Sequence, residues 1–100
     1  MQYLLEVMKM SQLLEWFERT ETDFILFSQT ICQYCNRAKR ILDSKNLSYT
    51  EVNLDHFDDL RNTVVKETRH RTVPAIFDLR KEKPLFIGGS DRLIEYLQER

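Results

Sequence analysis

Long apolar stretches and an excess of charge are both missing from this 100-residue chain. No apolar run approaches the ~20 residues that a helix needs to cross a bilayer, so we expect no membrane partner. The formal net charge is −1, which gives no long-range attraction to nucleic acid. The first ten residues carry Glu6 and no basic leader, a pattern that does not favour a signal peptide. We therefore expect a cytoplasmic protein.

Glycine and proline are scarce, with two residues of each kind. No linker rich in these residues and no internal repeat divides the chain, so residues 1–100 are expected to form one domain. Gly88 and Gly89 are adjacent and permit a positive φ. They would let a ligand lie close to backbone beside a helix N-terminus, or they form a plain tight turn. Pro74 cannot donate a sheet hydrogen bond, and its position fits a turn, an edge strand or a cis peptide.

Cysteine is equally scarce, because Cys32 and Cys35 are the whole complement. In a reducing compartment such a pair indicates catalysis or metal binding rather than a structural disulfide. A bridge across so short a loop would also restrict the unfolded chain little and stabilise the fold weakly.

Hydrophobic periodicity predicts alternating helices and strands. Apolar spacing favours helical structure over 2–19, as one helix or as two with a break at Met10–Ser11. The further elements expected are strands at 24–27, 49–54, 75–77 and 85–87, and helices from the cysteines to about 44–46, over 56–69, and from Ser90 onward. A charged hairpin connection is expected over 78–83. The first three strand–helix alternations predict parallel pairing, and the final hairpin predicts antiparallel pairing. A four-stranded mixed sheet with helices on both faces satisfies both.

The cysteine pair stands where an apolar strand meets a helix. Cys32 would lie at the helix N-terminus, where free N–H groups and the helix dipole favour a thiolate. Cys35, one turn further, would be more covered. This asymmetry is what dithiol exchange requires, because one thiolate attacks a disulfide and a second thiol resolves the mixed disulfide. Tyr34 would be exposed between them, and the basic residues Arg37, Lys39 and Arg40 are expected to face solvent for the most part.

Two other interpretations of the cysteines are weaker. A zinc site would need His56, His70 or carboxylates as further ligands, and their spacing does not match a known zinc pattern. An inert pair in the core is equally disfavoured by a strand–helix junction. We expect no metal, and we expect both histidines at the surface.

Three separated motifs, taken together, resemble those of the glutaredoxin family. They are Cys32-Gln33-Tyr34-Cys35, the segment from Arg71 to Phe77 with its Thr-Val-Pro, and Ile87-Gly88-Gly89-Ser90-Asp91. Their order, with these elements between them, covers nearly the whole chain. The resemblance implies a thioredoxin-like α/β fold with an N-terminal helix, and a monomeric thiol–disulfide oxidoreductase.

The resemblance also implies a glutathione site. Glutathione would form a mixed disulfide with Cys32, Pro74 would be cis and face the cysteines, and the Val73 backbone would pair with the glutathione peptide. Disulfide-bearing or glutathionylated proteins are the implied partners. The residues implied to line the groove are Gln29, Tyr34, Arg61, Arg71, Thr72, Val73, Pro74, Gly89, Ser90 and Asp91.

Three departures from the family pattern bear on the reductant. Gln33 replaces the usual proline, Gln29 replaces a usual lysine and so carries no charge for a carboxylate, and Arg92 stands where a second acid is common. A thioredoxin-like electron donor reduced by a flavoprotein reductase is therefore one alternative. A dimer that holds an iron–sulfur cluster through Cys32 and glutathione is another.

Overall fold

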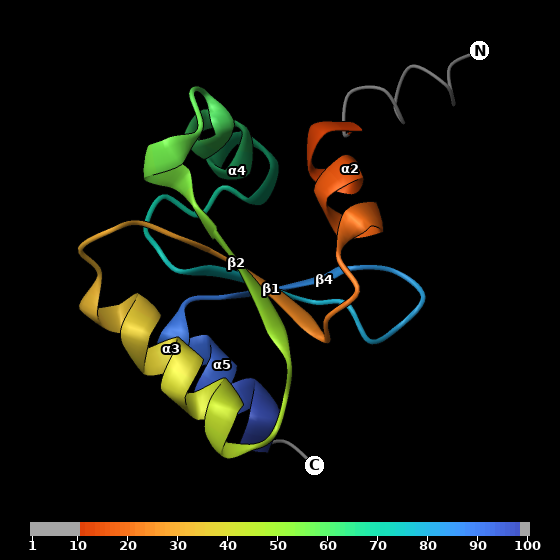
Figure 1. Ribbon diagram of the computed structural model, residues 1–100, viewed down its shortest axis with the longest axis vertical. Coiled ribbons are helices and arrows are strands. Elements are labelled where there is room, and N and C mark those ends of the chain that lie inside the picture. The colour runs from red at the N-terminus through yellow and green to blue at the C-terminus, as the bar shows by residue number, and fades with distance from the viewer. Residues whose placement is uncertain (1–10, 99–100) are drawn as a thin grey trace.

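Strand β1 (Phe24–Ser28) lies inside a four-stranded sheet, and its five residues are all buried. The computed structural model describes residues 11–98. Figure 1 shows the elements that flank this strand. These are α2 (Ser11–Arg19), α3 (Gln33–Ser44), β2 (Tyr49–Asn53), the 3-10 helix η1 (Leu54–His56), α4 (Leu60–Thr68), β3 (Ala75–Asp78), β4 (Leu85–Gly88) and α5 (Ser90–Gln98).

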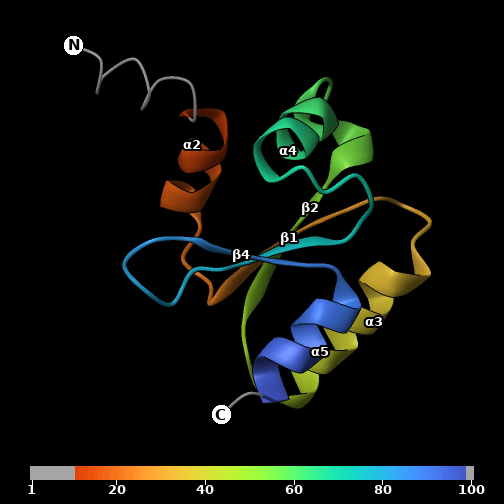
Figure 2. The ribbon, with the colours of Figure 1, turned by 180° about the vertical axis from the view of Figure 1, so that it is seen from behind.

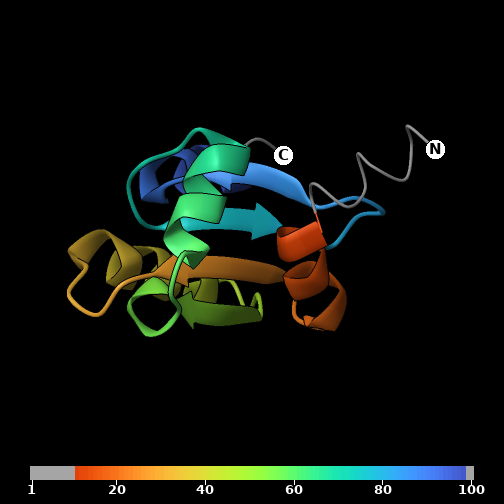
Figure 3. The ribbon, with the colours of Figure 1, turned by 90° about the horizontal axis from the view of Figure 1, so that it is seen from above.

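The strand order is β2-β1-β3-β4, and Figure 3 shows the four strands side by side. Strand β2 pairs with β1 in parallel, whereas β3 pairs with both β1 and β4 in antiparallel fashion. The prediction of a mixed sheet is confirmed. The continuous apolar run of β1 follows from this position, since side chains on both faces of a central strand are covered.

The predicted parallel pairing of the third strand is wrong. Ala75, which begins β3, pairs with Phe27 near the end of β1, and Asp78 pairs with Phe24. The segment through α4 therefore brings the chain back to the end of the sheet where β1 and β2 terminate. Strand β3 begins at that end and runs antiparallel to β1. Hydrophobic periodicity predicts whether a segment is a helix or a strand, but it does not predict at which end of the neighbouring strands the chain re-enters the sheet.

Two hydrophobic clusters cover the two faces of the sheet. Ile25 and Phe27 face a cluster that includes Leu13 of α2 and Val64 of α4. The alternate residues of β1, together with Ile76, pack with three buried side chains of α3 and α5: Ala38, Leu42 and Leu93. Figures 1 and 2 show the same division, with α2 and α4 on one side and α3 and α5 on the other. Helices therefore flank both faces, as predicted.

The helix predicted over 56–69 is shorter than expected. The Asn53 side chain caps η1 by accepting a hydrogen bond from the Asp55 amide, at 2.9 Å. Asp59 then takes a positive φ of 66° immediately before α4. Phe57 therefore lies outside the helix. Its ring packs edge-to-face against the Trp16 ring, with the ring centroids 5.2 Å apart. Of the predicted N-terminal helix, the stretch before Ser11 lies outside the described residues.

Asp78 was expected in an exposed hairpin but is the buried last residue of β3, with 1% of its surface exposed. Its carboxylate accepts hydrogen bonds from Arg80 Nε at 3.0 Å and Arg80 Nη2 at 2.9 Å. Tyr96 of α5 donates a third at 2.5 Å. Burial raises the pKa of Asp78, but these hydrogen bonds outweigh it and hold the pKa below its usual range.

Candidate active site

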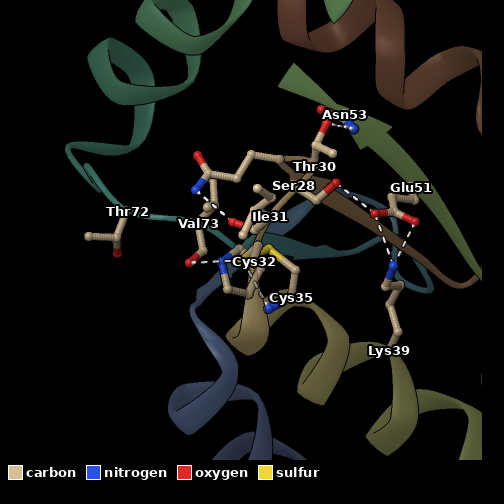
Figure 4. Close-up of a disulfide and its surroundings, with 12 residues drawn as sticks. Ser28, Thr30, Ile31, Cys32, Cys35, Lys39, Glu51, Asn53, Thr72 and Val73 are labelled. Carbon is tan, nitrogen blue, oxygen red and sulfur yellow. Dashed lines mark hydrogen bonds and ion pairs between the residues drawn. A yellow bond between two sulfur atoms is a disulfide. The ribbon is translucent and has the colours of Figure 1, made fainter. Parts of the chain in front are cut away.

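Cys32 and Cys35 form a disulfide at the N-terminus of α3 (Figure 4). Cys32 is the N-cap residue of the helix, with extended backbone. The Cys35 amide donates a hydrogen bond to Cys32 Sγ at 3.1 Å. A sulfur in this position receives a backbone N–H and the positive end of the helix dipole, and both favour a thiolate once the disulfide is reduced.

The two cysteines differ in exposure as expected. Cys35 is buried at 1%, whereas Cys32 is half-buried. Tyr34 is 59% exposed and Ile31 is 89% exposed, so two apolar surfaces flank Cys32. An incoming disulfide can therefore reach Cys32 but not Cys35.

The loop before Cys32 is tied to the end of β2. The Thr30 amide donates to Asp55 Oδ2 at 2.9 Å, and Asn53 Nδ2 donates to Thr30 Oγ1 at 3.1 Å. The hydrogen bond from the Thr30 amide lowers the pKa of Asp55. Gln29 donates its side-chain amide to the Ile31 carbonyl at 3.2 Å. This loop is therefore held by side chains as well as by its own backbone.

Arg61, which the resemblance implied to line the groove, lies beside this loop and is already paired with an acid. Its guanidinium donates to Asp55 Oδ1 at 3.1 Å, and about two fifths of each side chain is exposed. The sequence pattern did not indicate this role of Asp55, because it depends on the approach of η1 to Thr30. Arg71 is exposed beside Thr72 in the loop before β3.

The Val73–Pro74 peptide is cis, as the resemblance implied. Cys32 Sγ lies 3.9 Å from the Val73 carbonyl oxygen, and Figure 4 shows Val73 beside the cysteines. Pro74 is fully buried, and Thr72 is exposed. The segment that carries Val73 and Pro74 therefore lies beside the Cys32–Cys35 motif.

The Gly88–Gly89 turn brings the third motif to the same place. A Cβ built on Gly89 would lie 3.8 Å from the Pro74 carbonyl oxygen, so the turn borders the loop that holds Pro74. Ser90 is buried at the start of α5, whereas the Asp91 side chain is 82% exposed. Asp91 accepts a hydrogen bond from Arg37 of α3 at 2.8 Å. The Arg37–Asp91 and Arg61–Asp55 ion pairs are both largely exposed, and such pairs are individually weak.

The two glycines of this turn are expected to respond differently to alanine. Gly88 has a φ of +122°, and its Cβ would lie 3.3 Å from Arg92 Cγ, whereas a Cβ at Gly89 meets nothing closer than 3.8 Å. Gly88→Ala should lower the free energy of unfolding by about 1–3 kcal/mol, the usual cost of such backbone strain. Gly89→Ala, the matched control, should change it by less than about 1 kcal/mol. Urea unfolding of both variants measures the difference, and equal midpoints would contradict it.

The basic residues of α3 face solvent less than expected. Lys39 donates to both oxygens of Glu51, at 3.0 and 3.1 Å, and Ser28 donates to Glu51 Oε2 at 2.7 Å (Figure 4). Burial raises the pKa of Glu51, but these hydrogen bonds outweigh it and lower the pKa. Arg37 likewise pairs with Asp91. The prediction missed these pairs because each joins residues more than ten positions apart.

Metal binding and membrane insertion gain no support from the part of the chain that is described. Within residues 11–98, no three His, Cys, Asp or Glu side chains are arranged to hold a metal ion. None of the helices in that range is both long and apolar enough to span a membrane.

Comparison with known proteins bears on the whole arrangement. The family model described as Glutaredoxin matches residues 24–80. Glutaredoxin-2, mitochondrial, of Mus musculus is 38% identical over an alignment of 69 positions, which covers 66% of this chain and 42% of that protein. Glutaredoxin 3 of Escherichia coli is 35% identical over 68 residues, 68% of this chain and 77% of that protein. The chain thus spans about two fifths of the mammalian relatives that it matches.

A solved structure extends the similarity to nearly the full chain. The structure of a buckwheat glutaredoxin–glutathione complex matches with a TM-score of 0.76 and 26% sequence identity. The match covers 92% of this chain and 81% of the buckwheat chain. The thioredoxin-like fold expected from the sequence is therefore confirmed. The family model covers more than half of the residues, and the relatives and the fold agree with it, so the chain belongs to the glutaredoxin family.

Proposed function

We propose that the protein is a glutathione-dependent thiol–disulfide oxidoreductase of the dithiol Cys-x-Tyr-Cys type. The observation that carries the proposal is the position of Cys32. Its sulfur caps α3, receives the Cys35 amide at 3.1 Å and lies 3.9 Å from the Val73 carbonyl. A sulfur activated by a helix N-terminus and half-exposed next to a buried partner is suited to attack a disulfide.

The proposed reaction begins with the reduced protein. The Cys32 thiolate attacks one sulfur of a substrate disulfide, forms a mixed disulfide and releases the other sulfur as a thiolate that takes up a proton. Cys35, once deprotonated, then attacks Cys32 Sγ and releases the second substrate thiol. The product is the Cys32–Cys35 disulfide, the state that the structure contains. Two glutathione molecules would return it to the dithiol and leave as glutathione disulfide.

The proposed groove beside Cys32 would offer the polar groups that glutathione needs. The Val73 backbone would pair with the peptide of glutathione, and the Gly89-Ser90-Asp91 turn would receive its γ-glutamyl end. Arg61, Arg71 and Gln29 would lie toward the glycine carboxylate. Tyr34 would form part of the rim, where glutathionylated or disulfide-bearing proteins would also make contact. The buckwheat relative was solved as a glutaredoxin–glutathione complex, which supports this choice of co-substrate.

A second reductant is favoured by one observation. Gln29 is uncharged and Arg61 is paired with Asp55 at 3.1 Å, which leaves Arg71 as the remaining cation among the three residues proposed for the glycine carboxylate. A thioredoxin-like protein reduced directly by a flavoprotein reductase would not need that charge.

A comparison of reductants in one assay distinguishes the two functions. Reduction of a disulfide substrate should be at least about tenfold faster with glutathione and glutathione reductase than with thioredoxin reductase. The reason is that glutathione would gain at least one charge-assisted hydrogen bond in the proposed groove, and one such bond is worth about that factor in rate. The assay follows NADPH oxidation at equal enzyme concentrations, with Cys32→Ser as the blank for each reductant. Faster turnover with thioredoxin reductase would replace the proposed function by the electron-donor function.

A further inference from the structure

His70 lies among three segments that the proposed groove requires. It follows Arg69, whose positive φ of 62° ends α4, and its amide donates to Thr68 Oγ1 at 3.0 Å. This arrangement fixes the backbone of His70 at the start of the loop that leads to Val73 and Pro74. The residue was expected at the surface, but it is half-buried.

The imidazole of His70 contacts the loop that carries Val73. Nε2 lies 3.2 Å from the Pro74 carbonyl oxygen and 3.3 Å from Thr72 Oγ1. A carbonyl oxygen has no proton, so Nε2 must carry the proton that this hydrogen bond uses. His70 Nε2–H therefore donates to the Pro74 carbonyl oxygen on one side of Val73, and Thr72 Oγ1 lies within 3.3 Å of the same nitrogen on the other side.

The other side of the ring contacts β4 and the glycine turn. The imidazole meets the Phe86 ring edge-on, with centroids 5.5 Å apart. A Cβ at Gly89 would lie 3.9 Å from both Cε1 and Nε2 of His70. The imidazole therefore contacts both the Thr72–Pro74 loop and the turn that begins α5, beside the point where these two segments approach each other. The two segments would form the backbone walls of the proposed groove beside Cys32.

We propose that His70 is a positioning residue for the glutathione groove. The ring fixes the position of the two walls where they meet, through its hydrogen bond to Pro74 and its packing on Phe86. It does not touch the reacting sulfur atoms, so it acts on the binding of the glutathione moiety rather than on thiol exchange. This inference rests on the proposed function, because it assumes that glutathione occupies the groove.

Three substitutions separate the hydrogen bond from the packing. His70→Phe keeps a ring against Phe86 but has no donor, His70→Gln keeps a donor, and His70→Ala has neither. His56→Gln is the matched control, because His56 is the other histidine and lies in η1. The substrate is a peptide carrying a glutathione mixed disulfide, and the measurement is the separate determination of kcat and KM.

The expected result is a selective rise in KM. His70→Phe should raise KM about five- to tenfold, the loss expected for one hydrogen bond, with kcat within about twofold of wild type. His70→Gln should restore KM to within about twofold, His70→Ala should be at least as impaired as His70→Phe, and His56→Gln should match wild type. A wild-type KM for His70→Phe, or an equal rise for His70→Phe and His70→Gln, would overturn the inference.

A measurement without turnover keeps this inference distinct from the proposed function. Nitrogen-15 NMR of the imidazole nitrogens should show the Nε2–H tautomer for His70. His70→Phe should also shift the Val73 and Gly89 amide resonances more than His70→Gln does. An Nδ1–H tautomer would refute the inference whatever the activity. If wild type showed no turnover with glutathione while the tautomer and the amide shifts were as expected, the proposed function would fail and His70 would remain only the residue that orders the Val73 loop.

Discussion

Replacing Cys32 by serine should abolish turnover, with a loss on the order of 10³-fold or more, because a hydroxyl at this position cannot form the mixed disulfide. The sulfur is the N-cap atom of α3 and the half-exposed member of the pair. Serine is itself a good N-cap residue, so the helix and the fold should persist. The measurement is disulfide reduction with glutathione, alongside circular dichroism to verify folding.

Cys35→Ser is the matched control for this result. Cys35 is buried and can resolve a mixed disulfide only from within the protein. Its serine variant should lose the reduction of protein disulfides yet retain deglutathionylation, in which a second glutathione resolves the Cys32 mixed disulfide. Substantial activity in Cys32→Ser, combined with none in Cys35→Ser, would reverse the proposed roles.

The largest expected effect on stability comes from Asp78. Asp78→Ala should lower the free energy of unfolding by about 2–4 kcal/mol, because it removes a buried acceptor and leaves the Tyr96 hydroxyl and the Arg80 guanidinium without their partner. Arg80 is 32% exposed and can be partly rehydrated, which keeps the expected loss below that of a fully buried pair. Urea unfolding at neutral pH measures it, and a loss under about 1 kcal/mol would contradict the argument.

The same carboxylate should make stability depend on pH. Its pKa in the folded protein lies below the ordinary 3.8, so near and below that pH the unfolded chain binds more protons than the folded protein. The contribution is therefore complete above about pH 4 and is lost as the pH falls through the folded value. Asp78→Asn should flatten this acid dependence, whereas Tyr96→Phe should weaken it only in part because Arg80 remains. An unchanged acid dependence in Asp78→Asn would assign it to other carboxylates.

Local pattern was sufficient to predict much of the site. The apolar run of β1 indicated a strand covered on both faces, and the cysteines after it indicated a helix N-terminus. Both inferences use neighbours along the chain. The exposure of Tyr34 and the burial of Cys35 follow from the same local geometry.

Contacts between distant segments could not be predicted in the same way. The cis peptide before Pro74 was implied by the family resemblance, since periodicity left several conformations open. The pairing of Asp55 with Arg61 and the contact of His70 with Pro74 depend on how loops approach one another. The direction of β3 depends on the edge at which the chain re-enters the sheet. Asp78 was missed for a different reason, because the strand was expected to end at residue 77 and a residue in a solvated hairpin has no apparent need for buried partners.

The direction of β3 has a consequence for how the molecule can vary. Strands β1, β2 and β4 terminate at the end of the sheet where β3 begins. Every segment that approaches Cys32 therefore lies at that end. The connection between β3 and β4 lies at the opposite end of the sheet, and its residues 81–84, which follow the Asp78 partner Arg80, are exposed. Changes in the length or sequence of residues 81–84 are therefore separated from the chemistry by the full length of the strands. The residues that reactivity requires therefore lie at one end of the sheet, and the opposite end can accept tags, insertions and natural sequence divergence.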